Sequence, residues 1–204
     1  MAVIRSISGA RLADTLEVLI MSINIVPHRP YYRFRLVDTH AFYKCEVRGR
    51  VKCLVLDLVD DNSPDETTFL SYFCSFNPDG VVSTRIGPEC NYFFTAPLDG
   101  CSVGFGAANE AGNRTIAHAN YVSAGNALVD KKLTLAEERQ VQWDHQQNLI
   151  ESHIDDLDSV AHPPDYGHAA EDERNLKTTL IGVKSPHTHQ WEFIRQTYDI
   201  HRFD

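Results

Sequence analysis

The spacing of apolar and polar residues divides the chain into an N-terminal helical stretch, a long β-rich region, a second helix and a final hairpin. In residues 9–21, leucines at Leu12, Leu16 and Leu19 recur at intervals of three to four, which predicts an amphipathic helix. From Tyr31 onward the pattern changes to short apolar and aromatic runs separated by turn residues, as is typical of strands.

The β-rich region predicts an antiparallel meander followed by shorter strands. The run Asn77-Pro78-Asp79-Gly80 is a strong turn signal because Asn, Pro, Asp and Gly each favour turn conformations. The meander strands are expected at 31–37, 41–47, 51–59 and 67–76. The shorter strands are expected at 81–86, 92–95, 102–105 and 115–120.

A capping box opens the second helix. Thr134 and Glu137 have the Ser/Thr-x-x-Glu spacing that starts helices, and the helix is expected to extend to about Leu157. Residues 158–170 are expected to form a loop, and 178–184 to pair with 191–203. The fold class is therefore α+β, a β-sandwich or twisted mixed sheet flanked by helices, with residues 1–204 as a single domain.

Composition restricts the kinds of partner. The 204 residues are 43% hydrophobic, enough for a sizeable core, and the net charge of −9 argues against direct binding to a nucleic-acid backbone. The apolar stretch 16–26 contains Glu17 and is too short to span a membrane. It also lacks the cleavage site of a signal peptide, so we expect no signal peptide and no membrane attachment. We also expect the protein to be a monomer.

The five cysteines do not form a disulfide or metal pattern. Their number is odd and their spacing irregular, and Cys45, Cys53 and Cys74 lie in apolar runs where free cysteines are usually buried and inert. No Cys/His zinc spacing occurs, so no metal and no cofactor are expected.

One cysteine stands in a different setting. Gly100 permits a tight turn just before Cys101, and such a turn is able to present a sulfur atom at a sheet edge. His118 lies on the next expected strand, beyond a hairpin-like loop, and is a candidate base for the thiol. Asn120 is on the same strand face as His118 and is a candidate to orient the imidazole. Gly100 and Ser102 are expected to support the turn and an oxyanion.

This region resembles a known enzyme family. The pattern Phe93-Phe94-Thr95-x-x-Leu98-x-Gly100-Cys101-x-Val103, followed by a histidine on the next strand, is similar to the Burkholderia lethal factor-like members of the cytotoxic necrotizing factor and chemoreceptor glutamine deamidase superfamily. Thr95 lies six residues before the cysteine, as a threonine does in several members. The chain departs from the family at Asp99, where the family has a serine, and in a longer interval between cysteine and histidine.

The resemblance implies a toxin-type glutamine deamidase with the fold of a cytotoxic necrotizing factor catalytic domain. Cys101 would be the nucleophile, His118 the base, and Thr95 would orient His118 or help to bind the amide. The implied substrate is a glutamine of a host protein, with a translation-initiation RNA helicase favoured over a Rho-family GTPase and translation inhibition as the effect. The protein would be made in the bacterial cytoplasm without a signal peptide and act in the host cytoplasm as a virulence effector.

Two alternatives stay open at this point. Another thiol hydrolase, such as a protease or transglutaminase, would use the same cysteine and histidine. A non-enzymatic binding module with an acidic surface would instead depend on the net charge of −9.

Overall fold

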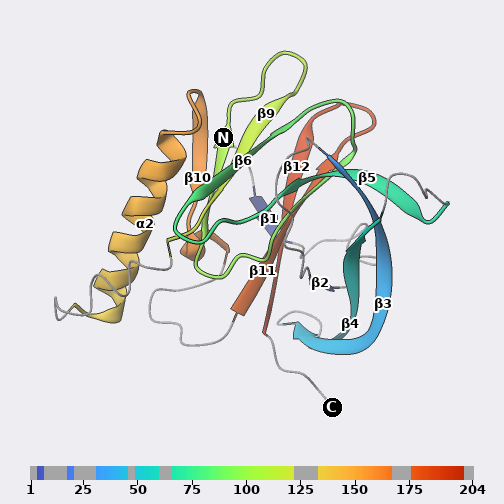
Figure 1. The fold of residues 1–204 in the computed structure, drawn as a ribbon, viewed down its shortest axis with the longest axis horizontal. Coiled ribbons are helices and arrows are strands. Elements are labelled where there is room, and N and C mark those ends of the chain that lie inside the picture. Colours follow the sequence, from blue (N-terminus) through green and yellow to red (C-terminus); the bar gives the residue numbers. More distant parts are fainter. Residues whose placement is uncertain are drawn as a thin grey trace.

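The computed structural model describes residues 4–6, 18–20, 31–45, 49–59, 66–121, 133–166 and 176–199. These residues form an α+β fold with an eight-stranded sheet, a four-stranded sheet and a long helix (Figure 1). The large sheet has the order β1-β12-β11-β7-β5-β3-β4-β2 and the small sheet the order β10-β8-β9-β6. The expected fold class is confirmed.

The large sheet combines strands from the first half of the chain with two strands from its end. Its strands are β1 (Ile4–Ser6), β2 (Val18–Ile20), β3 (Tyr32–Cys45), β4 (Gly49–Leu58), β5 (Thr68–Cys74), β7 (Tyr92–Thr95), β11 (Leu176–Lys184) and β12 (Trp191–Asp199). The long strand β3 pairs with β5 near its start and with β12 at its end, where Tyr198 is opposite Cys45. A register shift between Asp38 and Phe42 accompanies this change of partner, so the sheet closes on itself through β3.

The small sheet consists of β6 (Val81–Ile86), β8 (Ser102–Gly106), β9 (Arg114–Ala119) and β10 (Leu157–Ala161). All of its pairings are antiparallel. The main core lies between the two sheets, because one apolar cluster includes residues of both, such as Tyr72 and Phe193 from the large sheet and Val103 and Phe105 from the small one. A second cluster, which includes Phe34, Phe73 and Phe94, covers the other face of the large sheet.

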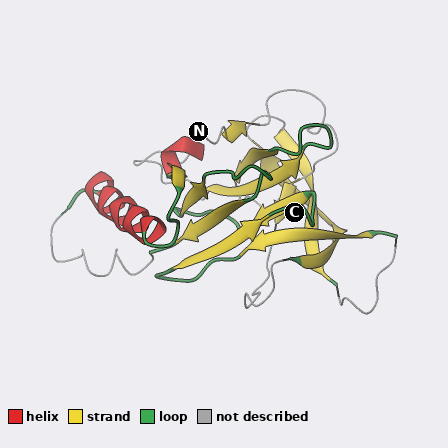
Figure 2. Cartoon of the chain, turned by 90° about the horizontal axis from the view of Figure 1, so that it is seen from above, coloured by secondary structure: helices red, strands yellow, loops and turns green. Residues whose placement is uncertain are grey.

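Helix α2 (Leu135–Glu151) covers the outer face of the small sheet (Figure 1, and from above in Figure 2). Its first turn has the predicted capping box, with Thr134 Oγ1 accepting from the Glu137 N–H and the Glu137 carboxylate accepting from the Thr134 N–H. Ile150 packs against Ala117 and Ala119 of β9. Gly104 of β8 allows this close approach, because a Cβ there would lie 2.2 Å from Ile150 Cγ2.

Three sequence predictions about elements need correction. Val18–Ile20 were predicted as helix but form a strand that pairs in parallel with β4. β-branched residues beside an open strand edge gain more from this pairing than from helical propensity. The rest of the predicted helix, residues 9–17 and 21, lies outside the described residues. Helix α2 ends at Glu151, and Leu157–Ala161, partly expected as loop, pair with β8 as strand β10. The region 31–76 is not a simple meander, since β5 pairs with β3 rather than β4.

Other elements agree with the predictions. The turn at Asn77–Gly80 is present, with Asp79 at φ 57° and the Gly80 N–H donating to the Asn77 carbonyl at 3.2 Å. The C-terminal hairpin of β11 and β12 is also present. A short 3-10 helix, η2 (Pro163–Tyr166), follows β10.

Candidate active site

A tight turn brings Cys101 to the start of β8. Gly100 has φ 78°, a conformation that glycine adopts without strain, so the turn predicted from the sequence is confirmed. Leu98 anchors the turn to β11, since its N–H donates to the Thr178 carbonyl at 2.7 Å and its carbonyl accepts from the Thr178 N–H at 3.0 Å. Asp99 is exposed, and its carboxylate is ion-paired with Lys177.

The strand register places three of the predicted side chains on one face of the small sheet. Val103 is opposite His118, and Ser102 is opposite Ala119. Continuing this ladder by one step puts Cys101 opposite Asn120, and the Asn120 Nδ2 donates to Cys101 Sγ at 3.3 Å. His118 is diagonal to Cys101 on the same face, at a separation that long side chains span in antiparallel pairs. The face is the one that looks toward the large sheet.

Asn120 therefore acts on the sulfur and not on the imidazole. The sequence prediction that Asn120 orients His118 is wrong, because the register sets Asn120 directly opposite the cysteine. An amide donor favours the charged form of the thiol, and the Asn120 contact lowers the Cys101 pKa relative to a thiol buried without it.

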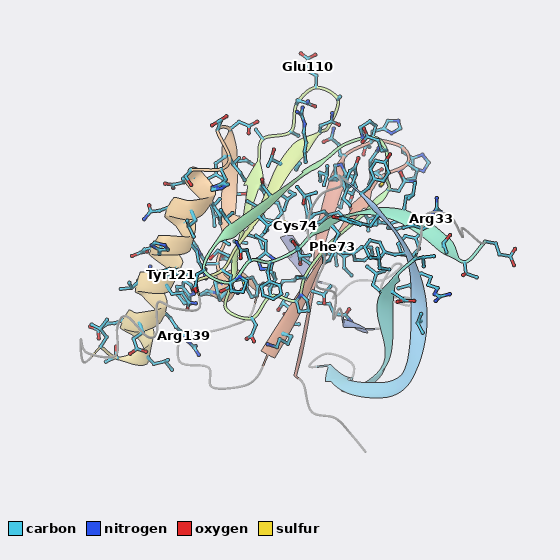
Figure 3. The ribbon with its side chains drawn as sticks, in the orientation of Figure 1. Arg33, Phe73, Cys74, Glu110, Tyr121 and Arg139 are labelled. Carbon is cyan, nitrogen blue, oxygen red and sulfur yellow. The ribbon has the colours of Figure 1, made fainter. Side chains whose placement is uncertain are left out.

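Thr95, on the large sheet, faces the same space between the two sheets. It pairs with Cys74 of β5, and it shares a strand face with Phe93, which belongs to the core between the sheets. Cys74 lies near the centre of the molecule (Figure 3). Within the described residues, the Thr95 hydroxyl is buried and makes no hydrogen bond, so it does not hold His118 in this structure.

His118 is fully buried and uncharged. Burial lowers its pKa to about 4, although the backbone of Ser75 and of Cys74 lies close enough to oppose this shift. Neither ring nitrogen forms a hydrogen bond of normal geometry among the described residues. Phe76 lies beside the ring, with centroids 6.5 Å apart.

Cys101 is also covered and uncharged. The residue is 2% exposed, and burial raises the pKa of its thiol to about 12. The sequence pattern predicts a sulfur presented at a sheet edge, and this prediction is wrong: β8 is a central strand of the small sheet, and the sulfur lies against the large sheet. The thiol and the imidazole are therefore a neutral, desolvated pair.

The peptide of Cys101 is held by two groups that the sequence analysis did not identify. Gln146 Nε2 of α2 donates to the Gly100 carbonyl at 3.0 Å, and the Tyr166 hydroxyl of η2 donates to the Cys101 carbonyl. Gln146 is fully buried between Trp143 and Ile150 on the inner face of α2. A polar residue at that apolar spacing was a signal visible in the sequence.

Ser102 points away from the Cys101 side chain. Its hydroxyl lies on the face covered by α2, 2.5 Å from Gln146 Oε1 and 2.8 Å from His162 Nδ1. The Ser102 side chain is thus placed to support the turn from the side of the sheet that α2 covers. It is on the wrong face to contact an oxyanion formed next to the sulfur.

Other features lie apart from the cysteine. A cavity of about 180 Å³ is lined by Tyr31, Tyr72, Arg85, Ile86, Gly87, Pro88, Glu89 and Asn113. It is at the Ile86–Arg114 end of the β6–β9 ladder, whereas His118 pairs with Val82 near the other end. Over the described ranges, no group of three or more His, Cys, Asp or Glu side chains is arranged to hold a metal ion. No helix in those ranges has the length and apolar character needed to cross a membrane.

Comparison with known proteins finds similarity to solved structures but to no family or curated protein. No protein-family model matches the chain, and no curated protein matches it significantly. The C-terminal domain of CNFy from Yersinia pseudotuberculosis, known from a crystal structure, is similar over 85% of each chain, with 13% sequence identity and a TM-score of 0.34. Because this likeness is weak, the function proposed below rests on the residues of this chain.

Proposed function

We propose that this protein is a cysteine-dependent amidohydrolase that converts a glutamine side chain of a target protein to glutamate. The observation that carries the proposal is the placement of Cys101, Asn120 and His118 on one face of adjacent strands, with the Asn120 amide donating to the sulfur at 3.3 Å. The motif from Phe93 to Val103, which resembles that of the glutamine deamidases, supports the same chemistry.

The chemistry needs one base and one nucleophile. His118 takes the Sγ proton of Cys101, and the sulfur attacks the carboxamide carbon of the glutamine. The Asn120 amide, already directed at the sulfur, is placed to stabilise the negative charge that develops beside it. The protonated His118 then gives its proton to the leaving nitrogen, which departs as ammonia and leaves a thioester.

Water completes the reaction. His118 takes a proton from water, the resulting hydroxide attacks the thioester carbon, and the carbon–sulfur bond breaks. The thiolate recovers a proton from His118, and the products are glutamate and ammonia. Thr95 faces the same interlayer with an unused hydroxyl, and we assign it to contact the amide or the imidazole when substrate is bound.

The burial of Cys101 and His118 affects both the proton transfer and the access of substrate. With a thiol pKa of about 12 and an imidazole pKa of about 4, the two groups do not exist as an ion pair before substrate arrives. Proton transfer would therefore accompany attack, as it does for a serine–histidine pair. Cys101 is covered, so we also propose that the two sheets separate locally to admit the substrate. The separation would occur at the end of the β8–β9 ladder where Cys101 and Asn120 lie.

The test is replacement of the sulfur. Purified protein is incubated with candidate targets, and released ammonia and a mass gain of about one dalton at a glutamine are measured. We expect Cys101→Ser to reduce the rate by at least about a thousandfold, since the nucleophile is lost. Cys90→Ser is the matched control, because Cys90 belongs to the same core cluster but lies at a turn outside the proposed site. Equal rates for the wild-type protein and Cys101→Ser would refute the proposal.

We further propose the target class that the motif resemblance favours, a translation-initiation RNA helicase, with a Rho-family GTPase as the other substrate to be tested side by side. The site of action would then be the cytoplasm of a host cell, and the outcome a loss of translation. In the same mass spectra, chain cleavage would identify a protease and a lysine cross-link a transglutaminase, both of which use the same thioester step.

A non-enzymatic role has one observation in its favour, the burial of both Cys101 and His118. In that case the two residues are core packing, and the acidic surface, including Asp155 and Asp156, binds a basic partner. A separate measurement of the biological effect distinguishes the two roles: charge reversal at these aspartates, and not Cys101→Ser, would then remove that effect.

A further inference from the structure

A buried chain of polar side chains lies directly behind the cysteine turn. Ser102 is fully buried on the outer face of β8, and its hydroxyl contacts Gln146 Oε1 at 2.5 Å and His162 Nδ1 at 2.8 Å. Gln146 in turn contacts the carbonyl of Gly100, the residue before the cysteine. The chain therefore links His162, which follows β10, to the backbone that carries Cys101.

The direction of each hydrogen bond follows from the fixed acceptor at the end of this chain. The Gly100 carbonyl only accepts, so the amide nitrogen of Gln146 must face it and the amide oxygen must face Ser102. An amide oxygen also only accepts, so the Ser102 hydroxyl must donate its single proton to Gln146. The contact between Ser102 and His162 then requires a proton on His162 Nδ1.

The other ring nitrogen of His162 faces a second amide. His162 Nε2 lies 2.9 Å from Gln147 Oε1, and the Gln147 Nε2 donates to the Glu151 carboxylate at 2.7 Å. A neutral ring with its proton on Nδ1 satisfies the inner contact and leaves Nε2 without a proton for Gln147. Gln147 is only partly buried, so water can replace that outer contact, whereas no such exchange is open to the fully buried Ser102.

The charge on the ring is set by its surroundings. Burial lowers the pKa of His162, while the carboxylates of Asp165 in η2 and Asp144 in α2 act in the opposite direction. Asp165 also accepts from the His162 backbone N–H at 2.8 Å, and the Trp143 ring lies 6.4 Å from the imidazole. Burial is the largest of these influences, so the pKa of His162 lies below its ordinary value, and whether the ring is charged or neutral the contact with Ser102 requires a proton on Nδ1.

We propose that His162 is a positioning residue for Cys101: its Nδ1–H fixes the Ser102 hydroxyl, which fixes the Gln146 amide, which holds the Gly100 carbonyl and so the turn that presents the sulfur. This inference deepens the proposed function and takes its importance for catalysis from it. It concerns the thiol itself, so it is tested without a deamidation assay.

The experiment measures how fast iodoacetamide alkylates each cysteine, by peptide mass spectrometry, in two variants of the full chain. Asn carries its amide nitrogen near the position of Nδ1, and Gln carries it near Nε2, so His162→Asn keeps the donor to Ser102 and His162→Gln loses it. We expect Cys101 to react at a wild-type rate within about twofold in His162→Asn. In His162→Gln it should react about tenfold faster, because one lost hydrogen bond loosens the turn that covers it.

Cys74 and Cys90 serve as internal controls, since both belong to the same core cluster as Cys101 and neither contacts the hydrogen-bonded side chains of Gln146, Ser102 and His162. Unchanged rates at these two cysteines, with Cys101 alone accelerated in His162→Gln, would establish positioning. Equal acceleration of all three cysteines, or equal behaviour of the Asn and Gln variants, would overturn the proposal. A nitrogen-15 spectrum of the wild-type imidazole gives a second check: a neutral His162 with its proton on Nε2 would also overturn it.

Discussion

At the residue scale, two polar residues close to Cys101 in the structure have different roles. Asn120 and Ser102 are both small polar residues near the cysteine, but the pleat sends them to opposite faces of the small sheet. Asn120 acts on the sulfur, and Ser102 acts on the backbone through Gln146. Asp99, the position at which the chain departs from the deamidase pattern, is exposed and ion-paired with Lys177.

The Asn120 contact predicts a change in thiol reactivity. Because the amide favours the thiolate, Asn120→Leu should raise the Cys101 pKa further and slow its alkylation at pH 9 by about tenfold or more, the range expected for a hydrogen bond to a charged group. Asn120→Asp should be slower still, because a carboxylate opposes the thiolate. Rates are measured by peptide mapping with iodoacetamide, and faster alkylation in both variants would contradict this role.

At the element scale, the small sheet is held between two different surfaces. Its inner face packs on the large sheet through aromatic and aliphatic side chains, and its outer face packs on α2 through small residues. Gly104 is the point of closest approach to the helix. This contact also fixes the distance at which Gln146, on the same helix, reaches the Gly100 carbonyl.

Substitution at Gly104 should show this dependence on packing. A Cβ at residue 104 would lie 2.2 Å from Ile150 Cγ2, so Gly104→Ala should lower the free energy of unfolding by about 1–3 kcal/mol, as overpacked cores do. Ile150→Leu removes the β-branched methyl group, so the same alanine should cost less in that background. Urea unfolding of the four proteins in this cycle gives the coupling, and strictly additive effects would show that the helix does not pack here as described.

At the scale of the whole molecule, the buried histidine links stability to pH. The pKa of His118 is about 4 in the folded protein, below the value of about 6.5 for an unfolded chain. Between these two values the unfolded state binds the proton and the folded state does not, so the free energy of unfolding falls as pH is lowered. Above pH 6.5 this residue makes no pH-dependent contribution, and below pH 4 the effect levels off.

The expected size is about 3 kcal/mol between pH 7 and pH 4, from roughly 1.4 kcal/mol for each unit of pKa difference. Other groups titrate in the same range, so the measurement is the difference between the wild-type protein and His118→Leu, each unfolded with urea across the pH range. A variant that loses as much stability on acidification as the wild-type protein would show that His118 is already solvated in the folded state.

Several elements were predictable because their signals are local. The Thr134 capping box, the Asn77–Gly80 turn, the Gly100 turn and the final hairpin each depend on residues close together in the chain, and each is present. The order of the strands was not predictable in this way. Val18–Ile20 and Leu157–Ala161 are strands because an edge of another strand, distant in sequence, is available to pair with them.

Sequence patterns were enough to predict the turn before Cys101, the strand face shared by His118 and Asn120, and the α+β class, because glycine conformation and side-chain alternation act over a few residues. The packing of distant segments was needed to show that the sulfur is covered, that Asn120 donates to it, and that Gln146 and Tyr166 hold its peptide. Burial and hydrogen-bond partners depend on which distant segments pack together, and that is settled by the closing of two sheets and a helix around the turn.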